Sequence, residues 1–251
     1  MSPRACQRSM VDTATMAAEA IEFIRAHEPP EGYFVAFSGG KDSIVTLELA
    51  RMAGVKHAAY YSATGIDPPE VVRFIRRCYP DVHWLRPKMS FYEAVYRKMP
   101  PSRLHRWCCD MLKKDPAKAV PLKHRLLGIR AEESPARAAR GRIDYHERLK
   151  LHQYKPIFGF LEWHIWDFIE GNGLPYPVLY DEGFHRVGCV ICPFLCRRNQ
   201  RMINMHRERW PTYYRAFEHA VKRWWDKKAR DRRPENSAEE YIAGWYRGFE
   251  D

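Results

Sequence analysis

The sequence contains no long hydrophobic run. No apolar stretch approaches the ~20 residues that a membrane-spanning helix needs, which argues against a helical membrane protein. The first twenty residues, MSPRACQRSMVDTATMAAEA, also lack the apolar core of a secretory signal peptide. We therefore expect a cytoplasmic protein without a membrane partner. Hydrophobic residues make up 45% of the chain and charged residues 29%, a balance typical of a globular protein with a sizeable core.

The sequence also lacks an even set of cysteines. Seven are present, and an odd number in a reducing compartment argues against a framework of disulfides. They are Cys6, Cys78, Cys108, Cys109, Cys189, Cys192 and Cys196. Five of them form an adjacent pair and, eighty positions later, a C-x-x-C with a third cysteine four residues beyond it. Clustered thiols of this kind predict a metal site, and the two isolated cysteines are interpreted as structural.

Acidic residues are too few to balance the basic ones. Forty-two Lys and Arg stand against 31 Asp and Glu, which gives a formal net charge of +11. Much of the excess lies at residues 197–233, where thirteen basic residues stand against four acidic ones. This pattern favours nucleic acid or another polyanion as a partner, and a solvated helix surface is the alternative.

The same basic region carries apolar and aromatic residues at three- and four-residue steps. They are Trp210, Tyr214, Phe217, Val221 and Trp224. This stripe predicts a buried helix face first and a base-stacking surface second. The basic residues on the remaining faces are the better candidates for contact with phosphates.

Short apolar runs alternate with helical segments in the first half of the chain. Strands are expected at 33–37, 56–65, 81–87 and 124–130, and helices at 11–27, 42–53 and 69–79. The alternation predicts an α/β fold with a doubly wound, mostly parallel sheet. Later segments are mostly helical. We expect one α/β domain over 1–195, followed by a basic helical appendage over 196–251.

A glycine turn follows the first predicted strand and opens a helix. In Ser38-Gly39-Gly40-Lys41-Asp42-Ser43, the glycines let the backbone approach an anion, the helix dipole attracts it, and Lys41 adds a full charge. The four residues that separate Gly from Gly-Lys in a Walker A loop are missing, so this is no GTPase-type P-loop. The turn predicts a phosphate site, and a tight turn without a ligand is the alternative.

The turn resembles the PP-loop of ATP pyrophosphatases, which split ATP between its α and β phosphates. SATGIDPPEVVRFI resembles the TG-x-x-x-PE segment of the phosphoadenylyl-sulfate (PAPS) reductase family, and GIRAEESPAR resembles its G-x-R-x-x-E/Q-S-x-x-R segment. Residues 155–192 resemble its P-I-x-x-W to GC-x-x-C segment, with Phe160 and His164 where the family has Trp and Asp. The resemblance covers about residues 33–195 and implies an adenine-nucleotide alpha-hydrolase-like fold.

The resemblance implies positions for ATP and its Mg²⁺. It places the pyrophosphate on Ser38, Gly39, Gly40, Lys41, Asp42 and Ser43. Adenosine would lie near Ala36, Ser62 and Gly65, at the ends of the first two strands. Arg130 and Arg137 would face the reacting phosphate, where guanidinium groups bind anions in a bidentate manner. Lys41, Asp42, Arg130 and Arg137 are therefore the predicted catalytic residues, with a plain surface arginine as the alternative for Arg137.

The resemblance also assigns the clustered cysteines. One subset of the family holds a [4Fe–4S] cluster with an adjacent cysteine pair and a C-x-x-C about eighty residues later. This pattern implies Cys108, Cys109, Cys189 and Cys192 as ligands. Four thiolates also suit tetrahedral zinc, and free thiols are a further alternative. Cys196 could replace a ligand, carry a sulfur atom or simply be buried.

Two features distinguish this chain from the sulfonucleotide reductases of the family. Those enzymes keep a nucleophilic cysteine in a C-terminal tail, and here no cysteine follows Cys196. They also tend to lose the Lys-Asp of the loop, which is intact here. Both features favour ATP as the substrate. The chain is closest in character to the ATP pyrophosphatases of DNA phosphorothioation, which work with a cysteine desulfurase.

The function expected from this resemblance is activation of a nucleic-acid phosphate or base by adenylation, followed by sulfur insertion. DNA is favoured over tRNA as the substrate because the +11 charge fits a DNA backbone. The alternatives are a PAPS or adenylyl-sulfate reductase, a tRNA thiolation enzyme, and a non-catalytic nucleotide- and cluster-binding subunit of a larger modification complex.

Overall fold

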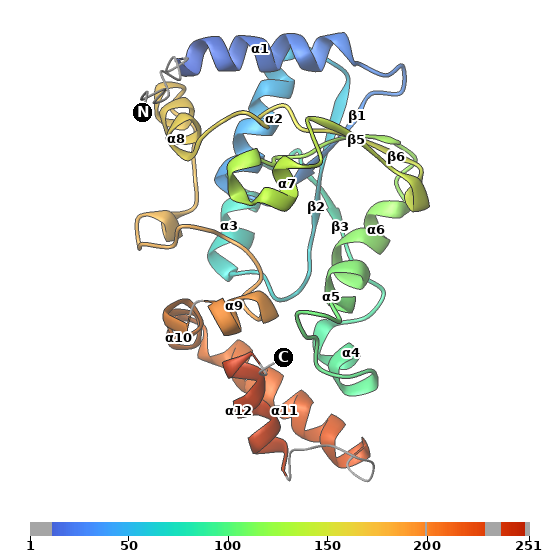
Figure 1. Ribbon diagram of the computed structural model, residues 1–251, viewed down its shortest axis with the longest axis vertical. Coiled ribbons are helices and arrows are strands. Elements are labelled where there is room, and N and C mark those ends of the chain that lie inside the picture. Colours follow the sequence, from blue (N-terminus) through green and yellow to red (C-terminus); the bar gives the residue numbers. More distant parts are fainter. Residues whose placement is uncertain (1–11, 199, 229–236, 249–251) are drawn as a thin grey trace, which may run out of the picture. The chain divides into compact units, whose positions relative to one another are not determined.

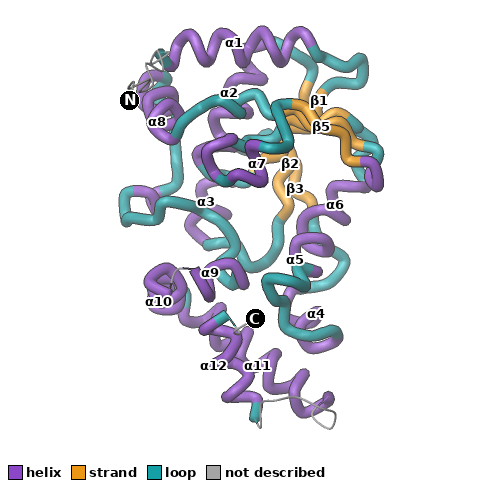
Figure 2. The backbone as a smooth tube through the Cα atoms, in the orientation of Figure 1, coloured by secondary structure: helices purple, strands orange, loops and turns teal. Residues whose placement is uncertain are grey.

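The computed structural model describes residues 12–198, 200–228 and 237–248. Within them, six strands form one sheet in the order β3-β2-β1-β4-β6-β5 (Figure 1, Figure 2). The strands are β1 (Tyr33–Phe37), β2 (His57–Ser62), β3 (His83–Leu85), β4 (His124–Leu126), β5 (Ile143–His146) and β6 (Leu151–Tyr154). β1 pairs with β4 and β4 with β6 in parallel, whereas β5 runs antiparallel to β6 at the edge. The predicted α/β fold with a mostly parallel sheet is confirmed.

Helices connect and flank these strands, as Figure 2 shows. The α-helices are α1 (Thr13–Ala26), α2 (Lys41–Ala53), α3 (Pro69–Cys78), α4 (Phe91–Arg97), α5 (Trp107–Cys109), α6 (Asp115–Lys118), α7 (Pro135–Ala138), α8 (Glu162–Gly171), α9 (Pro193–Arg198), α10 (Gln200–Arg209), α11 (Pro211–Lys228) and α12 (Ala238–Arg247). A π-helical turn (Asp110–Lys114) joins α5 to α6, and 3₁₀ turns lie at Ala131–Glu133, Glu147–Leu149 and Val178–Tyr180. None of the described helices is long and apolar enough to cross a membrane.

The strand–turn–helix unit over residues 33–53 forms as predicted, but two strands near residue 150 were missed. β5 and β6 are short and contain tyrosine, histidine and aspartate where buried strands usually carry aliphatic residues. The segment 199–228, predicted as one helical stretch, contains α10 and α11. They separate at Trp210-Pro211 because proline suits the first turn of a helix and is excluded from the interior.

The chain divides into two compact units. The first unit comprises the described residues of 1–60, 81–83 and 122–177. In it α1 packs against α2, and the buried core includes Ile24, Val35, Ile44, Leu47 and Leu126. The predicted domain boundary at residue 195 stays a prediction.

The second unit comprises residues 61–80, 84–121 and the described part of 178–251. Here α11 packs against α4 and α12. The apolar stripe of the basic region lies in this core, because Trp210, Tyr214, Phe217, Val221 and Trp224 are each at most 5% exposed. The stripe is therefore a buried helix face, as the sequence predicted first.

Gly128 allows the segment after β4 to touch the first turn of α2. A Cβ atom at this position would lie 2.7 Å from the carbonyl oxygen of Asp42 and 3.0 Å from Oγ1 of Thr46. The backbone oxygen cannot rotate away, so a side chain here would push the strand end from the helix. Glycine is required at this position because of the close approach.

We expect Gly128→Ala to lower the free energy of unfolding by about 1–3 kcal/mol, the usual cost of forcing extra atoms into a packed site. Urea denaturation followed by circular dichroism measures the change. Gly171→Ala is the matched control, because a Cβ at Gly171 meets no atom within 4 Å. Equal stability of the two variants would contradict the packing argument.

Candidate phosphate and cysteine sites

The predicted phosphate turn forms between β1 and α2 in the first unit. Gly39 has a φ of 72°, in the left-handed region that favours glycine, and Gly40 caps the N-terminus of α2. The hydroxyl of Ser43 donates to the carbonyl of Gly40 at 2.8 Å and accepts from the backbone N–H of Ser38 at 3.1 Å. These bonds hold the turn closed around the first turn of the helix.

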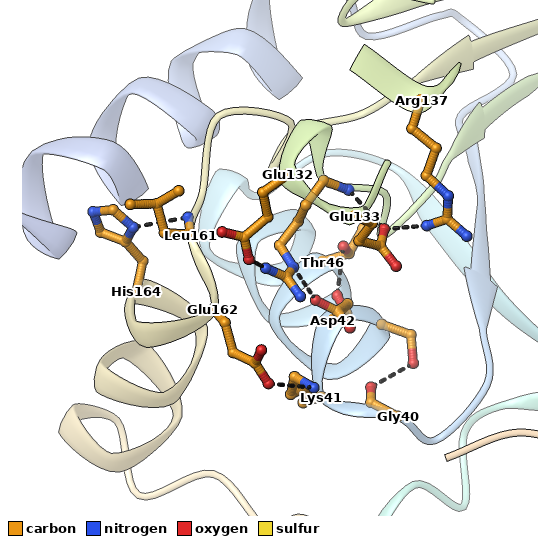
Figure 3. A network of polar contacts seen from close by, with 12 residues as sticks. Gly40, Lys41, Asp42, Thr46, Glu132, Glu133, Arg137, Leu161, Glu162 and His164 are labelled. Carbon is orange, nitrogen blue, oxygen red and sulfur yellow. Dashed lines mark hydrogen bonds and ion pairs between the residues drawn. The ribbon is translucent and has the colours of Figure 1, made fainter. Parts of the chain in front are cut away.

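Lys41 is the first residue of α2 and is buried, at 4% exposure. Its Nζ atom forms an ion pair with Oε1 of Glu162 at 3.0 Å, and the two side chains point toward each other in Figure 3. The ammonium also lies 5.8 Å from the ring centre of Trp166, which is on α8 with Glu162. The first turn of α8 thus supplies the carboxylate that neutralises the lysine of the turn.

Arg130 is held against the same turn. Its Nε donates to Oδ1 of Asp42 at 2.6 Å, and another guanidinium nitrogen pairs with Glu132. The arginine is 4% exposed, so both contacts take place largely out of water. The predicted residues Lys41, Asp42 and Arg130 are therefore brought together at the N-terminus of α2.

Arg137 is tied to this group through Glu133. One carboxylate oxygen of Glu133 accepts from the backbone N–H of Arg130 at 3.1 Å and also pairs with the guanidinium of Arg137 (Figure 3). The link is indirect, because Glu133 stands between the two arginines. Whether Arg137 faces a phosphate stays a prediction.

The three cations of the site share one arrangement, in which each already pairs with a carboxylate. Lys41 pairs with Glu162, Arg130 with Asp42 and Glu132, and Arg137 with Glu133. An incoming polyphosphate must compete with these carboxylates for the cations. The site can bind an anion at a helix N-terminus, where backbone amides, the helix dipole and buried cations act together.

The residues predicted to contact adenosine lie in two different units. Ala36 is half-buried on β1 in the first unit. Ser62 and Gly65 belong to the second unit, where the Ser62 hydroxyl donates to the carbonyl of Lys113 at 3.3 Å and Gly65 has a φ of 77°. Their joint contact with adenosine stays a prediction.

All four predicted metal ligands lie in the second unit. Cys108 and Cys109 are on α5, immediately before the π-helical turn, and such turns are frequent at functional sites. Cys189 and Cys192 are on the loop before α9. This loop is fixed through Val190, whose N–H donates to the carbonyl of Ile66 at 2.8 Å and whose carbonyl accepts from the hydroxyl of Tyr214 at 2.9 Å.

The thiols influence one another's protonation. A hydrogen bond from Cys108, together with the positive charges of Lys113 and Arg106, lowers the pKa of Cys109 to about 6. Burial, with the nearby charge of Asp67, raises the pKa of Cys189 to about 11. The thiolate form of Cys189 and the charge of Asp67 in turn raise the pKa of Lys113, whose ammonium stays protonated. This cluster contains one thiol poised as a thiolate beside a permanent cation.

The donor set fits a thiolate-bound metal chemically, since Cys108 interacts with the other three cysteines and those three interact with Lys113, all in a single unit. As placed, however, the described His, Cys, Asp and Glu side chains form no group of three or more that could hold a metal ion. Cys6 and the side chain of Cys196 lie outside the described residues. The assignment of a cluster or of zinc to the four cysteines therefore remains a proposal.

Four residues of these two sites were not singled out in the sequence. Glu162 and Glu132 pair with the cations of the phosphate turn, and Lys113 and Asp67 adjoin the cysteines. Asp67 is buried and accepts hydrogen bonds from Tyr61 at 2.6 Å and from the Thr64 hydroxyl at 2.8 Å. Each lies inside or beside a quoted motif, but nothing in the linear spacing shows which charges will meet.

Removing the carboxylate of Glu162 should make anion binding stronger. Glu162→Gln frees Lys41 from a competing ion pair, and because Glu162 is half-exposed we expect inorganic pyrophosphate to bind about two- to fivefold more tightly. Isothermal titration calorimetry at low ionic strength measures the change. Glu170→Gln, an exposed position on the same helix, is the control for net charge. Equal affinities for both variants would show that Glu162 does not compete with the anion.

Comparison with known proteins identifies relatives of this chain. A phosphoadenosine phosphosulfate reductase of Gloeobacter violaceus is 27% identical over 164 residues, which are 62% of this chain and 68% of that protein. An uncharacterized protein of Methanocaldococcus jannaschii is 31% identical over 205 residues, or 77% of this chain. The chain spans 42% of that relative and 40% of a second uncharacterized protein from the same organism.

The fold has a counterpart among solved structures. The phosphate complex of PAPS reductase from Candida auris superposes with a TM-score of 0.54 and 19% identity, covering 69% of this chain and 87% of that one. This likeness shows a shared fold. At the level of sequence, the family described as the phosphoadenosine phosphosulfate reductase domain matches residues 32–195. Because the match covers well over half of the chain, the protein belongs to the PAPS reductase domain family.

Proposed function

We propose that the protein is a PP-loop ATP pyrophosphatase that activates a nucleic-acid phosphate for sulfur insertion, most specifically in DNA phosphorothioation. The observation that supports ATP as the substrate is the meeting of Lys41, Asp42 and Arg130 at the N-terminus of α2. Two buried cations beside a glycine turn suit the β and γ phosphates better than a single sulfate group.

The residues of the first unit have separate roles in this proposal. Lys41 and the amides of the turn stabilise the negative charge on the departing pyrophosphate, and Arg130 orients the α-phosphate. Asp42, whose side chain is 25% exposed, is the carboxylate best placed to take the Mg²⁺ that accompanies ATP. Glu162 leaves Lys41 as the phosphates arrive.

The proposed chemistry proceeds in two displacements. A non-bridging oxygen of a DNA phosphate attacks the α-phosphorus of ATP, so that pyrophosphate leaves and AMP is attached to the DNA. The terminal sulfur of a persulfide then attacks the DNA phosphorus and displaces AMP. A thiol reduces the remaining S–S bond and leaves sulfur on the DNA. A cysteine desulfurase is the proposed source of the persulfide.

A [4Fe–4S] cluster is proposed on Cys108, Cys109, Cys189 and Cys192. When bound, such a cluster supplies electrons or carries sulfur. The role of the protein here is to gather thiolates, and Lys113 favours them because its charge offsets theirs. Zinc on the same ligands is the alternative, and the metal content of protein purified without oxygen separates the two.

Sulfonucleotide reduction is the second candidate function, because the relative from Gloeobacter violaceus is named a phosphoadenosine phosphosulfate reductase. In that case thioredoxin would drive release of sulfite from an adenylyl sulfate. The same purified protein can be assayed for sulfite and for pyrophosphate, so the two candidates are compared directly.

The first test concerns ATP cleavage. Wild-type protein should convert ATP into AMP-level products and pyrophosphate, and Lys41→Ala should slow the reaction on the order of a hundredfold, the loss expected for one charge on the leaving group. Chromatography of the nucleotides, with DNA or tRNA present or omitted, measures the products. Lys118→Ala, an exposed lysine on α6, is the control. Formation of ADP and phosphate would exclude the pyrophosphatase assignment.

The second test concerns the cysteines. Protein purified without oxygen should be brown and contain about four irons and four sulfides per chain. Cys192→Ser should lose the colour and lower the melting temperature, because a metal site that joins distant segments also stabilises the fold. Cys78→Ser, at the end of α3, should keep both. Stoichiometric zinc without iron would replace the cluster assignment and leave the ligands in place.

A further inference from the structure

Helix α11 carries an inclined row of cationic and histidine side chains. Arg215, His219, Arg223 and Lys227 follow one another at four-residue steps and all are exposed. Residues four apart lie on one face of a helix, so these four side chains form a single stripe, which we call the basic stripe. The opposite face of the helix is buried in the core of the second unit.

A cleft runs beside the basic stripe. Helix α4 packs against α11, and the cleft of about 460 Å³ between them is lined on the α4 side by Tyr92, Tyr96 and Arg97. On the α11 side it is lined by His219 and Arg223. Figure 1 shows α4 next to α11. The cleft therefore has tyrosine rings and an Arg97–Glu93 ion pair on the α4 side, and His219 and Arg223 on the α11 side.

Tyr96 holds two cations of the stripe in place. The guanidinium of Arg223 lies 4.5 Å from the centre of its ring and the ammonium of Lys227 lies 4.9 Å from it. Within the described part of the chain, neither cation has a carboxylate as an ion-pair partner. Side chains ordered by an aromatic ring lose less entropy when a ligand binds, and their charge is still available to an anion.

Two carboxylates near the stripe already have partners, and one of them, Glu93, lines the cleft itself. Glu93 pairs with Arg97 at 2.6 Å, and Glu218 accepts from the hydroxyl of Tyr246 at 2.6 Å. Asp226 is exposed on the stripe's own helix. At the other end of the stripe, Arg215 borders a second cleft of about 350 Å³ with Arg207 and Glu208, and Arg207 lies 4.3 Å from the ring centre of Tyr246. An arginine over a tyrosine thus occurs at both ends of the stripe, and the second pair is supplied by α10 and α12.

We propose that the basic stripe and its cleft bind the phosphate backbone of DNA. The choice of DNA as the polyanion rests on the proposed function, and the surface itself rests on the geometry of the stripe and the cleft. From Arg215 to Lys227 the stripe spans twelve residues, or about 18 Å of helix. One strand of duplex DNA carries about five phosphates over that length, so a row of four donors matches a strand better than a compact anion.

The contacts of the stripe are of the kind that position a nucleic acid and do not read its sequence. Arginine and lysine donate to phosphate oxygens, and an exposed histidine donates in the same way. The surface should therefore bind DNA of any sequence with strong salt dependence. Specificity for a site would come from elsewhere in the protein or from a partner.

The test compares two double variants that lose the same charge. Arg223→Gln/Lys227→Gln removes two members of the stripe, whereas Lys118→Gln/Lys222→Gln removes two exposed lysines that already pair with Asp115 and Glu239. Binding of the full chain to a fluorescent duplex of about 20 base pairs is measured by anisotropy between about 50 and 200 mM salt. We expect the stripe variant to bind the duplex about tenfold more weakly than wild type at about 100 mM salt. The slope of log K against log[salt] should become smaller by about 1.8, the value for two lost phosphate contacts. The control variant should bind the duplex within about twofold of the wild-type affinity, and its salt slope should match that of wild type.

Tyr96→Leu supplies a second measurement. It keeps every charge but removes the ring under the two cations, and it should weaken DNA binding about two- to fivefold without changing the salt slope. Circular dichroism melts confirm that all variants fold. Equal losses in the stripe and control variants would overturn the proposal. So would tighter binding of tRNA or of polyglutamate than of the duplex, because the surface would then serve RNA or an acidic protein.

DNA binding is measured without ATP, so this inference and the proposed function fail separately. If the stripe variant binds DNA as well as wild type while ATP is cleaved to pyrophosphate, the proposed surface is wrong and the activity stands. If ATP is not cleaved but the stripe variant loses affinity and salt slope as expected, the surface stands and the activity is wrong.

Discussion

The close contact of Gly128 with the first turn of α2 is the constraint on which the proposed phosphate site depends. Only glycine lets the segment after β4 come so near, because a Cβ atom there would lie 2.7 Å from the carbonyl oxygen of Asp42. Two residues later Arg130 reaches the Asp42 carboxylate at 2.6 Å. The glycine sets how closely the segment after β4 approaches α2, and the ion pair with Asp42 sets the direction in which the Arg130 side chain points. Without that approach the buried guanidinium would lie away from the turn.

Charge balance explains how several cations can gather at this turn. Buried cations are costly unless they are paired, and the chain supplies Glu162, Asp42, Glu132 and Glu133 as partners. The same carboxylates compete with an incoming phosphate. The affinity for a nucleotide would thus depend on the difference between the cation–phosphate pairs that form and the cation–carboxylate pairs that are broken. The nucleotide must offer more charge, or a metal ion must offset the released carboxylates, and the proposed substrate, ATP with Mg²⁺, would supply both.

The second unit uses its polar groups in two different ways. Around the cysteines, the buried carboxylate of Asp67 and the exposed Lys113 lie close to the thiols, so their charges shift the pKa values of the neighbouring groups. Along α11 the stripe residues are exposed, and two of them, Arg223 and Lys227, lie over the ring of Tyr96. The first environment suits chemistry on sulfur, and the second suits a long, highly charged ligand.

The sequence by itself determined the glycine turn, the mostly parallel α/β sheet, the buried stripe of α11 and the family. These features depend on local spacing: a strand followed by glycines and a helix, or apolar residues at three- and four-residue steps. The strands β5 and β6 were missed because tyrosine, histidine and aspartate replace the aliphatic residues that mark a strand. Only the tertiary structure decided that Glu162 pairs with Lys41, that Asp67 and Lys113 join the cysteines, and that Tyr96 lies under Arg223. Apart from Lys113 and Cys109, which are four positions apart, those partners are separated by tens to more than a hundred positions in the chain, and contacts between such positions leave no periodic signal.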